Sequence, residues 1–423
     1  MKVIISAIAC APGEGSEGGV GWRAVQRIAR EHDVRVITQE MNRPSWERAE
    51  REGTVPRSVR VRYVDCGTGW HPNRMIARIQ SWTRYLKFSR EVLDMAKAWH
   101  DEEPADLVHQ VTYATWRVPS PLWQMPVPFV WGPVGGTAMF PKQFLGTLGK
   151  AARAFEMVRE VQGSLAARSS AFIRCVENSA VVLAANGETS MFLKPYRRGR
   201  PLLELPVAYM TRNEVEVFSK PLVEKESARG PLKLFAGGNI EGRKGVSMAL
   251  RAIHRLKQQG IRVEYTVAGG GPEIPTLRKL ASRLGIDELV HFHPGYRGRD
   301  YVRKLQESDV YFLPSFRETN PVTLLEASLA GCVPVVAGAS GSGEMARMIG
   351  GDAIPAASPD ALIDGLAAAV MRLHHDRGEL KRRSCAVSKS AADLYSEIRY
   401  DEIIGRAYEV AVQGVHKDGV IAS

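Results

Sequence analysis

Short runs rich in β-branched and aromatic residues alternate with longer amphipathic segments along the chain. In the first half the runs are Lys2–Ile8, Val34–Thr38, Val59–Val64, Asp106–Val111, Phe129–Trp131 and Val181–Ala184, and in the second half they are Leu232–Ala236, Arg262–Val267, Val290–His293, Val310–Leu313 and Val333–Val336. Strands separated by helices of this length belong to parallel sheets. The alternation therefore predicts an α/β fold, and 423 residues are too many for one ordinary core.

The alternation weakens in a proline-containing polar stretch at 201–217, where we expect a domain connection. We predict two doubly wound, Rossmann-like domains, at 1–205 and 206–395. A further helical pattern at 396–412 is expected to pack back toward the N-terminal domain, and 413–423 to form a flexible tail. Because ligands of open α/β sheets bind beyond the carboxyl ends of the strands, two such sheets facing each other predict a two-substrate cleft.

Residues typical of helix ends support this order of elements in the second half. Ser358 followed by Pro359 indicates an N-cap and a first helical position, whereas Gly260, Gly285 and Gly331 stand where helices are expected to stop. The predicted helices therefore have defined ends as well as an apolar period.

The N-terminus opens with Lys2 and a short apolar run, Val3–Ala9, as secretory leaders do. The run leads directly into a Gly/Glu segment and an amphipathic pattern, so we interpret it as a buried first strand. No uninterrupted apolar stretch reaches the roughly 18 residues that a membrane span needs. The five cysteines are scattered, without metal-ligand spacing, and indicate reduced thiols. We therefore expect a cytoplasmic protein.

The formal net charge of +11 favours an anionic partner, such as nucleic acid, acidic lipid headgroups or a phosphorylated small molecule. The basic residues are spread along the chain and form no recognisable nucleic-acid-binding module. We therefore expect no nucleic-acid partner.

The segment Ser315–Val336, SFRETNPVTLLEASLAGCVPVV, carries two carboxylates beyond a buried strand. Glu318 lies on the predicted loop, and Glu326, eight residues later, lies in the first turns of a helix that opens near Thr323. A carboxylate can accept hydrogen bonds from two adjacent sugar hydroxyls, and a helix N-terminus attracts phosphate oxygens. The alternative is that Glu318 is a solvated loop residue and that Glu326 stabilises the helix dipole.

Several segments together resemble one enzyme family. Glu318 and Glu326, with the segment LLEASLAGCVPVVA, resemble the Glu-x7-Glu signature of retaining glycosyltransferases of family 4, which have the GT-B fold. The segments LFAGGNIEGRKG, YTVAGGGPEIPTLRKLA and DVYFLPS are similar to the family's glycine loops and to the strand before its first glutamate. The resemblance covers most of the second half and implies two Rossmann-like domains facing across a cleft.

The resemblance implies a role for each matching residue. Glu326 is expected to hold the ribose hydroxyls of a nucleoside diphosphate sugar and Glu318 to contact its sugar, while Arg243 and Lys244 neutralise the diphosphate. Such cations lower the barrier because the diphosphate departs as an anion. A polar helix entry is the alternative for Arg243 and Lys244, although cations are unfavourable at a helix N-terminus. The family also implies retention, and with no DxD-like cluster we expect no metal and no cofactor.

Two segments depart from the family pattern. Many members carry a cation several residues before the lysine, where this chain has Gly237-Gly238-Asn239, so Arg243 is expected to substitute for it. The loop after the first glutamate is commonly glycine-rich, whereas here it is Thr319-Asn320-Pro321. Proline removes one backbone donor, which leaves Thr319 and Asn320 as candidate phosphate donors.

Glycines also follow predicted strands in the N-terminal half. GEGSEGGVGW follows the first strand and resembles the family's loop facing the donor diphosphate, which makes Gly18 and Gly19 candidates. A surface turn is the alternative. PFVWGPVGGTAMFP looks like the WGPVGG stretch of a bacterial subgroup but lacks the catalytic-region histidine of many relatives. His109, on the preceding strand, is a candidate acceptor-side residue or a packed core histidine.

Two further regions complete the expected site. His293, Tyr296 and Arg297 follow a strand that in the family lies near the nucleobase, so they are candidate base contacts. The segment 70–99 is basic and aromatic. It is either a helix that packs on its domain or an interfacial helix at an anionic membrane surface, receiving a lipid-linked acceptor.

We therefore predict a metal-independent, retaining glycosyltransferase that moves a sugar from a UDP- or GDP-sugar to a glycan or lipid-linked acceptor. Cell-surface polysaccharide or glycoconjugate biosynthesis in bacteria is the expected setting, at the inner face of the membrane. The alternatives are a nucleotide-sugar-binding protein without turnover and a GT-B epimerase or phosphorylase.

Overall fold

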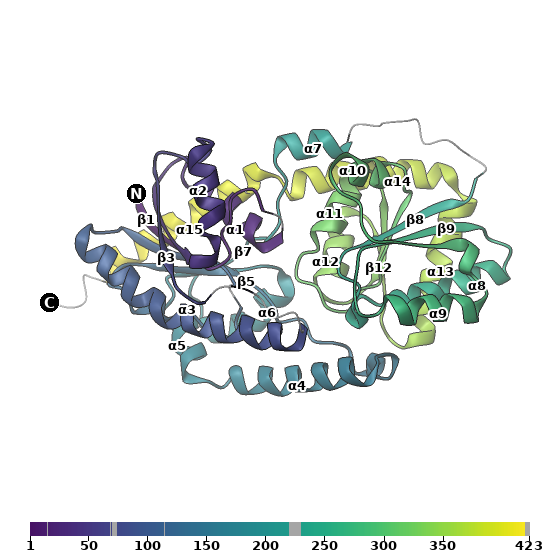
Figure 1. The fold of residues 1–423 in the computed structure, drawn as a ribbon, viewed down its shortest axis with the longest axis horizontal. Helices are drawn as coiled ribbons and strands as arrows, with labels where there is room; N and C mark the ends of the chain where they lie inside the picture. Colours follow the sequence, from purple (N-terminus) through teal and green to yellow (C-terminus); the bar gives the residue numbers. More distant parts are fainter. Residues whose placement is uncertain (15, 68, 70–73, 114, 220–229, 419–423) are drawn as a thin grey trace. The chain divides into compact units, whose positions relative to one another are not determined.

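The computed structural model describes the chain except for residues 15, 68, 70–73, 114, 220–229 and 419–423 (Figure 1). It divides into two compact units. Unit 1 comprises Met1–Thr137, Gln162–Val207 and Tyr400–Ser423, and unit 2 comprises Ala138–Val161 and Ala208–Arg399. The long helix α4, Lys150–Ala166, begins in one unit and ends in the other.

Unit 1 is built on a seven-stranded sheet of order β3-β2-β1-β4-β5-β6-β7, with all neighbours parallel. Its strands are β1 (Lys2–Ala7), β2 (Asp33–Gln39), β3 (Val59–Val64), β4 (Leu107–Thr112), β5 (Phe129–Val134), β6 (Val181–Ala184) and β7 (Leu202–Glu204). Its helices include α1 (Ser16–Ile28), α2 (Arg43–Arg51), α3 (Arg74–Glu102), α5 (Ser170–Asn178), α6 (Gly187–Arg197) and most of α15 (Glu397–Asp418). The first strand is central and buried, as expected for Val3–Ala9.

Unit 2 is built on a six-stranded parallel sheet of order β10-β9-β8-β11-β12-β13. Its strands are β8 (Leu232–Gly237), β9 (Val263–Ala268), β10 (Val290–His293), β11 (Val310–Phe312), β12 (Val333–Ala337) and β13 (Asp352–Ile354). Its helices are α7 (Arg212–Ser219), α8 (Val246–Gln258), α9 (Ile274–Leu284), α10 (Gly298–Gln306), α11 (Val322–Leu329), α12 (Ser340–Ile349), α13 (Pro359–His375) and α14 (Arg377–Leu394). In Figure 1, α8 and α9 lie on one side of this sheet, and α11 and α12 on the other.

The predicted strands are confirmed, with shifts of at most three residues at their ends. Two strands were not predicted, β7 and β13, and each has three residues at the edge of its sheet. Such short edge strands show no period that distinguishes them from loops. The stretch 201–217, where we expected a domain connection, holds β7 and most of α7, and the boundary between the two units falls inside it, between Val207 and Ala208.

The helix ends follow the predicted signals. The Ser358 side chain accepts a hydrogen bond from the Ala361 N–H at 3.2 Å at the start of α13. Gly285, with φ +63°, ends α9, and Gly260 and Gly331 adopt positive φ just after α8 and α11. The final helix α15 extends beyond the predicted 412 to Asp418.

The core of unit 1 takes up much of α3. Tyr85, Phe88, Val92 and Trp99 are buried in it, and Leu86 and Leu93 pack against it. The packing alternative therefore accounts for Leu86 and Leu93, whereas Trp82 is 44% exposed, and residues 70–73 and the side chains of 74–79 lie outside the described part. No helix in the described residues has the length and apolar character to cross a bilayer.

Candidate functional site

The sheet of unit 2 reverses its strand order between β8 and β11, which are neighbours although two strands of the sheet, β9 and β10, separate them in sequence. In doubly wound sheets, the loops at such a switch point diverge and leave a crevice at the carboxyl ends of the strands. Here β8 ends at Gly237 and β11 at Phe312. The chain directly after these two strands carries Arg243, Lys244 and Glu318.

The loop after β8 lies unusually close to the loop after β11. Gly245 has φ +66°, and a Cβ atom added there would lie 2.2 Å from the Pro314 carbonyl oxygen. The Phe316 N–H also donates to the Arg243 carbonyl oxygen at 2.9 Å. Only glycine permits both this conformation and this approach. The RKG segment therefore fixes Lys244 beside the chain that leads to Glu318.

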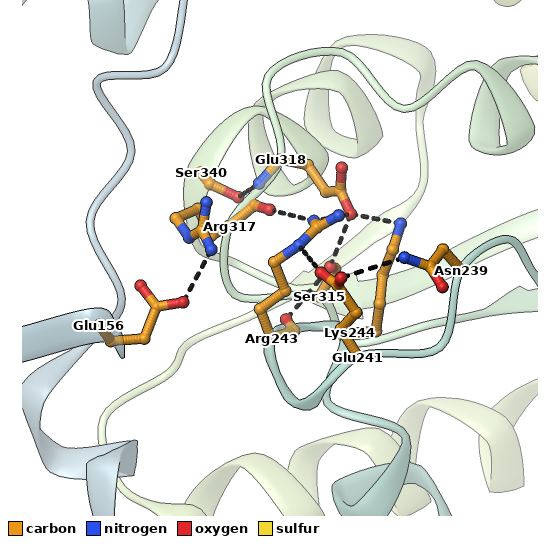
Figure 2. A network of polar contacts seen from close by, with 9 residues as sticks. All are labelled: Glu156, Asn239, Glu241, Arg243, Lys244, Ser315, Arg317, Glu318 and Ser340. Atoms are coloured by element: carbon orange, nitrogen blue, oxygen red, sulfur yellow. Dashed lines mark hydrogen bonds and ion pairs between the residues drawn. The ribbon is translucent and has the colours of Figure 1, made fainter. Parts of the chain in front are cut away.

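Arg243, Lys244 and Ser315 all converge on one oxygen of Glu318 (Figure 2). The distances to Oε1 are 2.8 Å from Arg243 Nη1, 2.5 Å from Lys244 Nζ and 3.0 Å from Ser315 Oγ. The Lys244 and Glu318 side chains are 10% and 13% exposed. Figure 2 shows the second Glu318 oxygen pointing away from both cations. We call Arg243, Lys244, Ser315 and Glu318 the switch-point cluster.

Charge governs the ionisation of this cluster. Burial alone raises the pKa of Glu318, but the positive charges of Lys244 and Arg243 outweigh it and hold the pKa below its usual value. Arg243 is desolvated as well, yet Glu318 and Glu241 raise its pKa. Glu241 Oε2 lies 3.0 Å from Arg243 Nε. The two cations therefore have two carboxylates, Glu318 and Glu241, as ion-pair partners.

The backbone that carries Glu318 is held on both sides. The Glu318 N–H donates to Ser340 Oγ at 3.1 Å, and the Gly341 N–H donates to the Glu318 carbonyl at 2.9 Å. Ser340 adopts φ +55°, a conformation that non-glycine residues rarely keep outside functional or tightly constrained sites. On the other side, Arg317 pairs with Glu156 of α4 at 2.7 Å, with side chains 16% and 7% exposed. The loop is thus fixed before any ligand arrives.

Glu326 lies in the second turn of α11, half-buried, as its position after Pro321 predicts. Its Oε2 accepts a hydrogen bond of 2.6 Å from the Tyr301 hydroxyl of α10. Burial, followed by the Glu326 charge, raises the pKa of Tyr301, so this phenol is a donor at neutral pH. Thr319 and Asn320 are half-buried on the loop before the helix. No side chain caps α11 within the described structure.

His293 and Tyr296 form a stacked pair at the carboxyl end of β10. Their ring centroids are 3.9 Å apart and the rings are almost parallel, at 4°. The Gly295 N–H donates to His293 Nδ1 at 3.1 Å, which fixes the histidine ring. Both rings are half-buried, whereas Arg297 is exposed. A flat, partly exposed aromatic pair suits stacking with a planar ligand.

The glycine segment of unit 1 has a structural explanation. It is largely helical, because α1 begins at Ser16, so Gly18 and Gly19 lie in the first turn. A Cβ atom on Gly19 would lie 2.4 Å from the Glu14 carbonyl oxygen, and one on Gly21 would lie 2.0 Å from that of Ala9. Close packing of α1 therefore requires glycine at both positions, and a ligand role for Gly18 and Gly19 stays a prediction.

His109 is a packed core residue, and its acceptor-side interpretation is wrong. The side chain is completely buried in β4, and burial lowers its pKa to about 4. Nε2 lies 2.7 Å from the Gly132 carbonyl oxygen and Nδ1 lies 2.8 Å from the Tyr408 hydroxyl. Because a carbonyl only accepts, Nε2 carries the hydrogen and Nδ1 accepts from Tyr408. The neutral ring fixes α15 to the sheet of unit 1.

Among the described residues, no three His, Cys, Asp or Glu side chains gather as metal ligands. A cavity of about 440 Å³ lies between α8, α9, α13 and residues 146–149. It shares Glu241 and Gly242 with the switch-point region, but Lys244, Glu318 and Glu326 do not line it.

Sequence reasoning missed Tyr301, Ser340 and the Arg317–Glu156 pair. Tyr301 and Ser340 belong to no recognised motif, and they reach the site only through tertiary packing. Ser315 and Glu241 had a weak signal, since each lies within three residues of a predicted site residue.

Residues 222–385 match a family described as glycosyl transferases group 1. The chain is 34% identical over 146 residues to the GDP-mannose-dependent alpha-(1-6)-phosphatidylinositol monomannoside mannosyltransferase of Mycolicibacterium smegmatis, covering 30% of this chain and 38% of that protein. It is 28% identical over 134 residues to the amylovoran biosynthesis glycosyltransferase AmsK of Erwinia amylovora, covering 30% and 32%. The chain thus spans only about a third of the length of these curated relatives.

Solved structures match over almost the whole chain. Sucrose-phosphate synthase from Thermosynechococcus elongatus has a TM-score of 0.65 at 14% identity, covering 96% of this chain and 98% of its own. Anabaena HepE in complex with UDP-glucose has a TM-score of 0.57 at 13% identity, covering 97% and 99%. At these identities the likeness shows the fold alone. The chain therefore has the GT-B fold, and its residues 222–385 match the model of the glycosyl transferases group 1 family.

Proposed function

We propose that the chain is a retaining glycosyltransferase of family 4 that uses a UDP- or GDP-sugar and needs no metal. Its acceptor is a glycan or a lipid-linked sugar made for a bacterial surface polysaccharide or glycoconjugate, on the cytoplasmic side of the membrane. The observation that carries the proposal is the switch-point cluster, in which the buried Lys244 and the half-buried Arg243 are held on Glu318 within the region matched to the group 1 family.

The cluster is suited to a diphosphate because its cations are already desolvated and oriented. In the unliganded chain, Glu318 and Glu241 supply the compensating negative charge. A donor diphosphate takes over Lys244 and Arg243 as partners, since phosphate oxygens accept charge-assisted hydrogen bonds from both residue types. The second Glu318 oxygen is then the group that meets the donor sugar.

The nucleoside half of the donor is held by Glu326 and by the aromatic pair. Tyr301 occupies Glu326 Oε2 and orients the carboxylate for the ribose hydroxyls. The nucleobase stacks on the face of the His293–Tyr296 pair. Thr319 and Asn320, on the loop before α11, donate to phosphate oxygens, and Gly18 and Gly19 are the proposed diphosphate contacts of unit 1.

The chemistry follows from charge development. As the bond from the sugar to the diphosphate breaks, negative charge grows on the leaving oxygen, where Lys244 and Arg243 stabilise it. The chain offers no residue that we assign as a nucleophile. The departing phosphate therefore accepts the proton of the acceptor hydroxyl, which attacks from the same face of the sugar and retains the anomeric configuration.

The relatives support the donor and setting by their names. One is a GDP-mannose-dependent mannosyltransferase and another makes amylovoran, and the HepE structure holds UDP-glucose. The main rival is a nucleotide-sugar-binding protein without turnover, and the neutralised state of the two cations favours it. An epimerase or phosphorylase of GT-B fold is the enzymatic rival.

The deciding experiment combines binding with product analysis. A panel of UDP- and GDP-sugars is screened for stabilisation of the chain against heat, since a ligand of the native state raises the apparent Tm. The stabilising donor is then incubated with and without a lipid extract that supplies acceptors. We expect rapid donor consumption only with acceptor, and a glycosylated product. Binding without consumption would establish the rival without turnover, and acceptor-independent epimerisation would establish the epimerase.

A further inference from the structure

The helix α4 exposes an apolar stripe. Met157, Val158, Val161 and Leu165 are 52%, 56%, 60% and 66% exposed, which sets α4 apart from the other helices in the described structure. Val158, Val161 and Leu165 follow one another at intervals of three and four residues, so they lie on one helical face. A face with this period is normally buried, and here it points to solvent. An exposed apolar patch of this kind marks an interaction site.

The opposite face of α4 fixes this orientation. Glu156 is 7% exposed and pairs with Arg317, and the buried Gly163 lies against Trp116, whose ring would be 3.5 Å from an added Cβ atom. Each of these contacts lies within one unit. The apolar stripe cannot turn inward without breaking them.

The exposed charges of α4 that have no ion-pair partner among the described residues are positive. Lys150 and Arg153 are exposed, and among the described residues neither has a carboxylate within ion-pair distance. The two acidic residues of the helix are engaged, Glu156 with Arg317 and Glu160 with Lys142. The exposed positions of α4 therefore combine apolar and cationic side chains, and the partly exposed carboxylate of Glu160 is paired with Lys142.

The combination of apolar and cationic side chains on α4 favours one kind of binding partner over another. A second copy of the chain would bring the same cations, against a net charge of +11 on each molecule. An anionic bilayer offers phosphates for Lys150 and Arg153 and acyl chains for the stripe, as interfacial helices require. We propose that α4 binds the surface of an anionic lipid bilayer, with Val158, Val161 and Leu165 inserted below the headgroups.

The inference rests on the proposed function, because it places the membrane contact of a lipid-linked acceptor on α4 in place of 70–99. It also has a consequence for the site. Glu156, on the opposite face of the same helix, holds Arg317 next to Glu318. The Glu156–Arg317 ion pair therefore connects the membrane-binding helix to the loop that carries Glu318.

The test is co-sedimentation of the full chain with vesicles of phosphatidylcholine containing about one-third phosphatidylglycerol, with pure phosphatidylcholine as the neutral comparison. We expect binding to the anionic vesicles that weakens as salt is raised. Val158→Ser combined with Val161→Ser and Leu165→Ser is expected to lower the partition coefficient by at least about tenfold, because three apolar side chains no longer insert. Lys150→Gln combined with Arg153→Gln is expected to lower it about thirtyfold, roughly fivefold per cation.

Matched control variants make comparable changes in charge and in exposed apolar surface at positions outside α4. Lys381→Gln with Arg382→Gln removes the same charge from exposed positions of α14, and Met191→Ser with Ile398→Ser removes side chains that are 77% and 67% exposed. Both controls should bind vesicles like the wild type. Equal losses in controls and α4 variants, or no preference for anionic vesicles, would overturn the proposal. So would a dimer in sedimentation velocity that only the α4 apolar variant dissolves, since a second copy then covers the stripe.

Vesicle binding is measured without donor, so its failure is separate from failure of the proposed function. Donor consumption with detergent-solubilised acceptor, in the absence of vesicle binding, would overturn the α4 inference and leave the transferase intact. Vesicle binding without donor consumption would overturn the proposed transferase function and leave the α4 inference intact.

Discussion

The two units share one sheet topology and use its switch point differently. Unit 1 places His109 on β4, beside its switch point, and both ring nitrogens are engaged by other parts of unit 1. Unit 2 has Arg243, Lys244 and Glu318 at the equivalent place, in contact with one another and close to solvent. The fold supplies the place, and the side chains decide whether chemistry can occur there.

Glycines with close backbone contacts occur in both units, and they too differ in what surrounds them. Gly19 in unit 1 and Gly245 in unit 2 both permit a backbone approach that a Cβ atom would block. In unit 1 the approach seats the first turn of α1. In unit 2 the residue before the glycine is Lys244, so the approach also holds a cation in position. A glycine-rich segment is therefore evidence of a site only with the charged residues around it.

The largest expected effect is that of Lys244→Ala. Removing a desolvated cation from the leaving diphosphate should lower kcat/KM by on the order of a hundredfold or more. The measurement is steady-state transfer with the donor found by thermal screening. Near-wild-type turnover in a folded variant would show that the switch-point cluster of unit 2 does not stabilise the leaving diphosphate.

Glu326→Gln should follow, with a loss also on the order of a hundredfold. The amide keeps the size of the side chain but loses the charge that accepts hydrogen bonds from ribose hydroxyls and from Tyr301. Donor titrations by calorimetry, alongside transfer rates, locate the loss. An unchanged donor affinity would show that Glu326 does not hold the nucleoside.

Tyr301→Phe is predicted to weaken donor binding by about tenfold, because a hydrogen bond to a charged group is worth about 1.5–3 kcal/mol. Tyr301 acts through Glu326, so the change should appear in KM rather than kcat. In the double variant with Glu326→Gln the phenylalanine should add little. Additive losses would assign Tyr301 a role of its own.

Acid should weaken unit 2 through Glu318. The pKa of Glu318 is lowered in the folded chain, so its stabilisation is complete above the unfolded value of about 4.3 and is lost as pH falls through the folded pKa. The Tm difference between the wild type and Glu318→Gln should therefore shrink below about pH 4. A difference that stays constant from pH 7 to pH 3 would contradict the ion-paired state of the cluster.

The smallest effect on donor binding is expected from His109→Gln in unit 1. Loss of the bonds to Gly132 and Tyr408 should cost roughly 1–3 kcal/mol of stability and lower the Tm by several degrees. Donor affinity should stay within about twofold, since the residue is internal to unit 1. A tenfold drop in donor affinity at unchanged stability would show that His109 contributes to ligand binding.

The element order and the position of the glutamates could be predicted because period, glycine punctuation and motif spacing are local signals. The contact of Arg243 with Glu318 could not, since it depends on how loops 75 residues apart pack together. The contact of Tyr301 with Glu326 could not be predicted either, because Tyr301 belongs to no recognised motif. The apolar residues of α4 have the period of a buried helical face, and such a period alone does not tell whether the face is covered.

The central claim is that the donor diphosphate binds at the switch point of unit 2. A crystal structure of the chain with its stabilising nucleotide sugar tests this most directly. We predict phosphate oxygens within hydrogen-bond distance of Lys244 Nζ and the Arg243 guanidinium, with the ribose on Glu326. A diphosphate bound in the 440 Å³ cavity, or on unit 1 with Lys244 and Glu318 still paired, would contradict it.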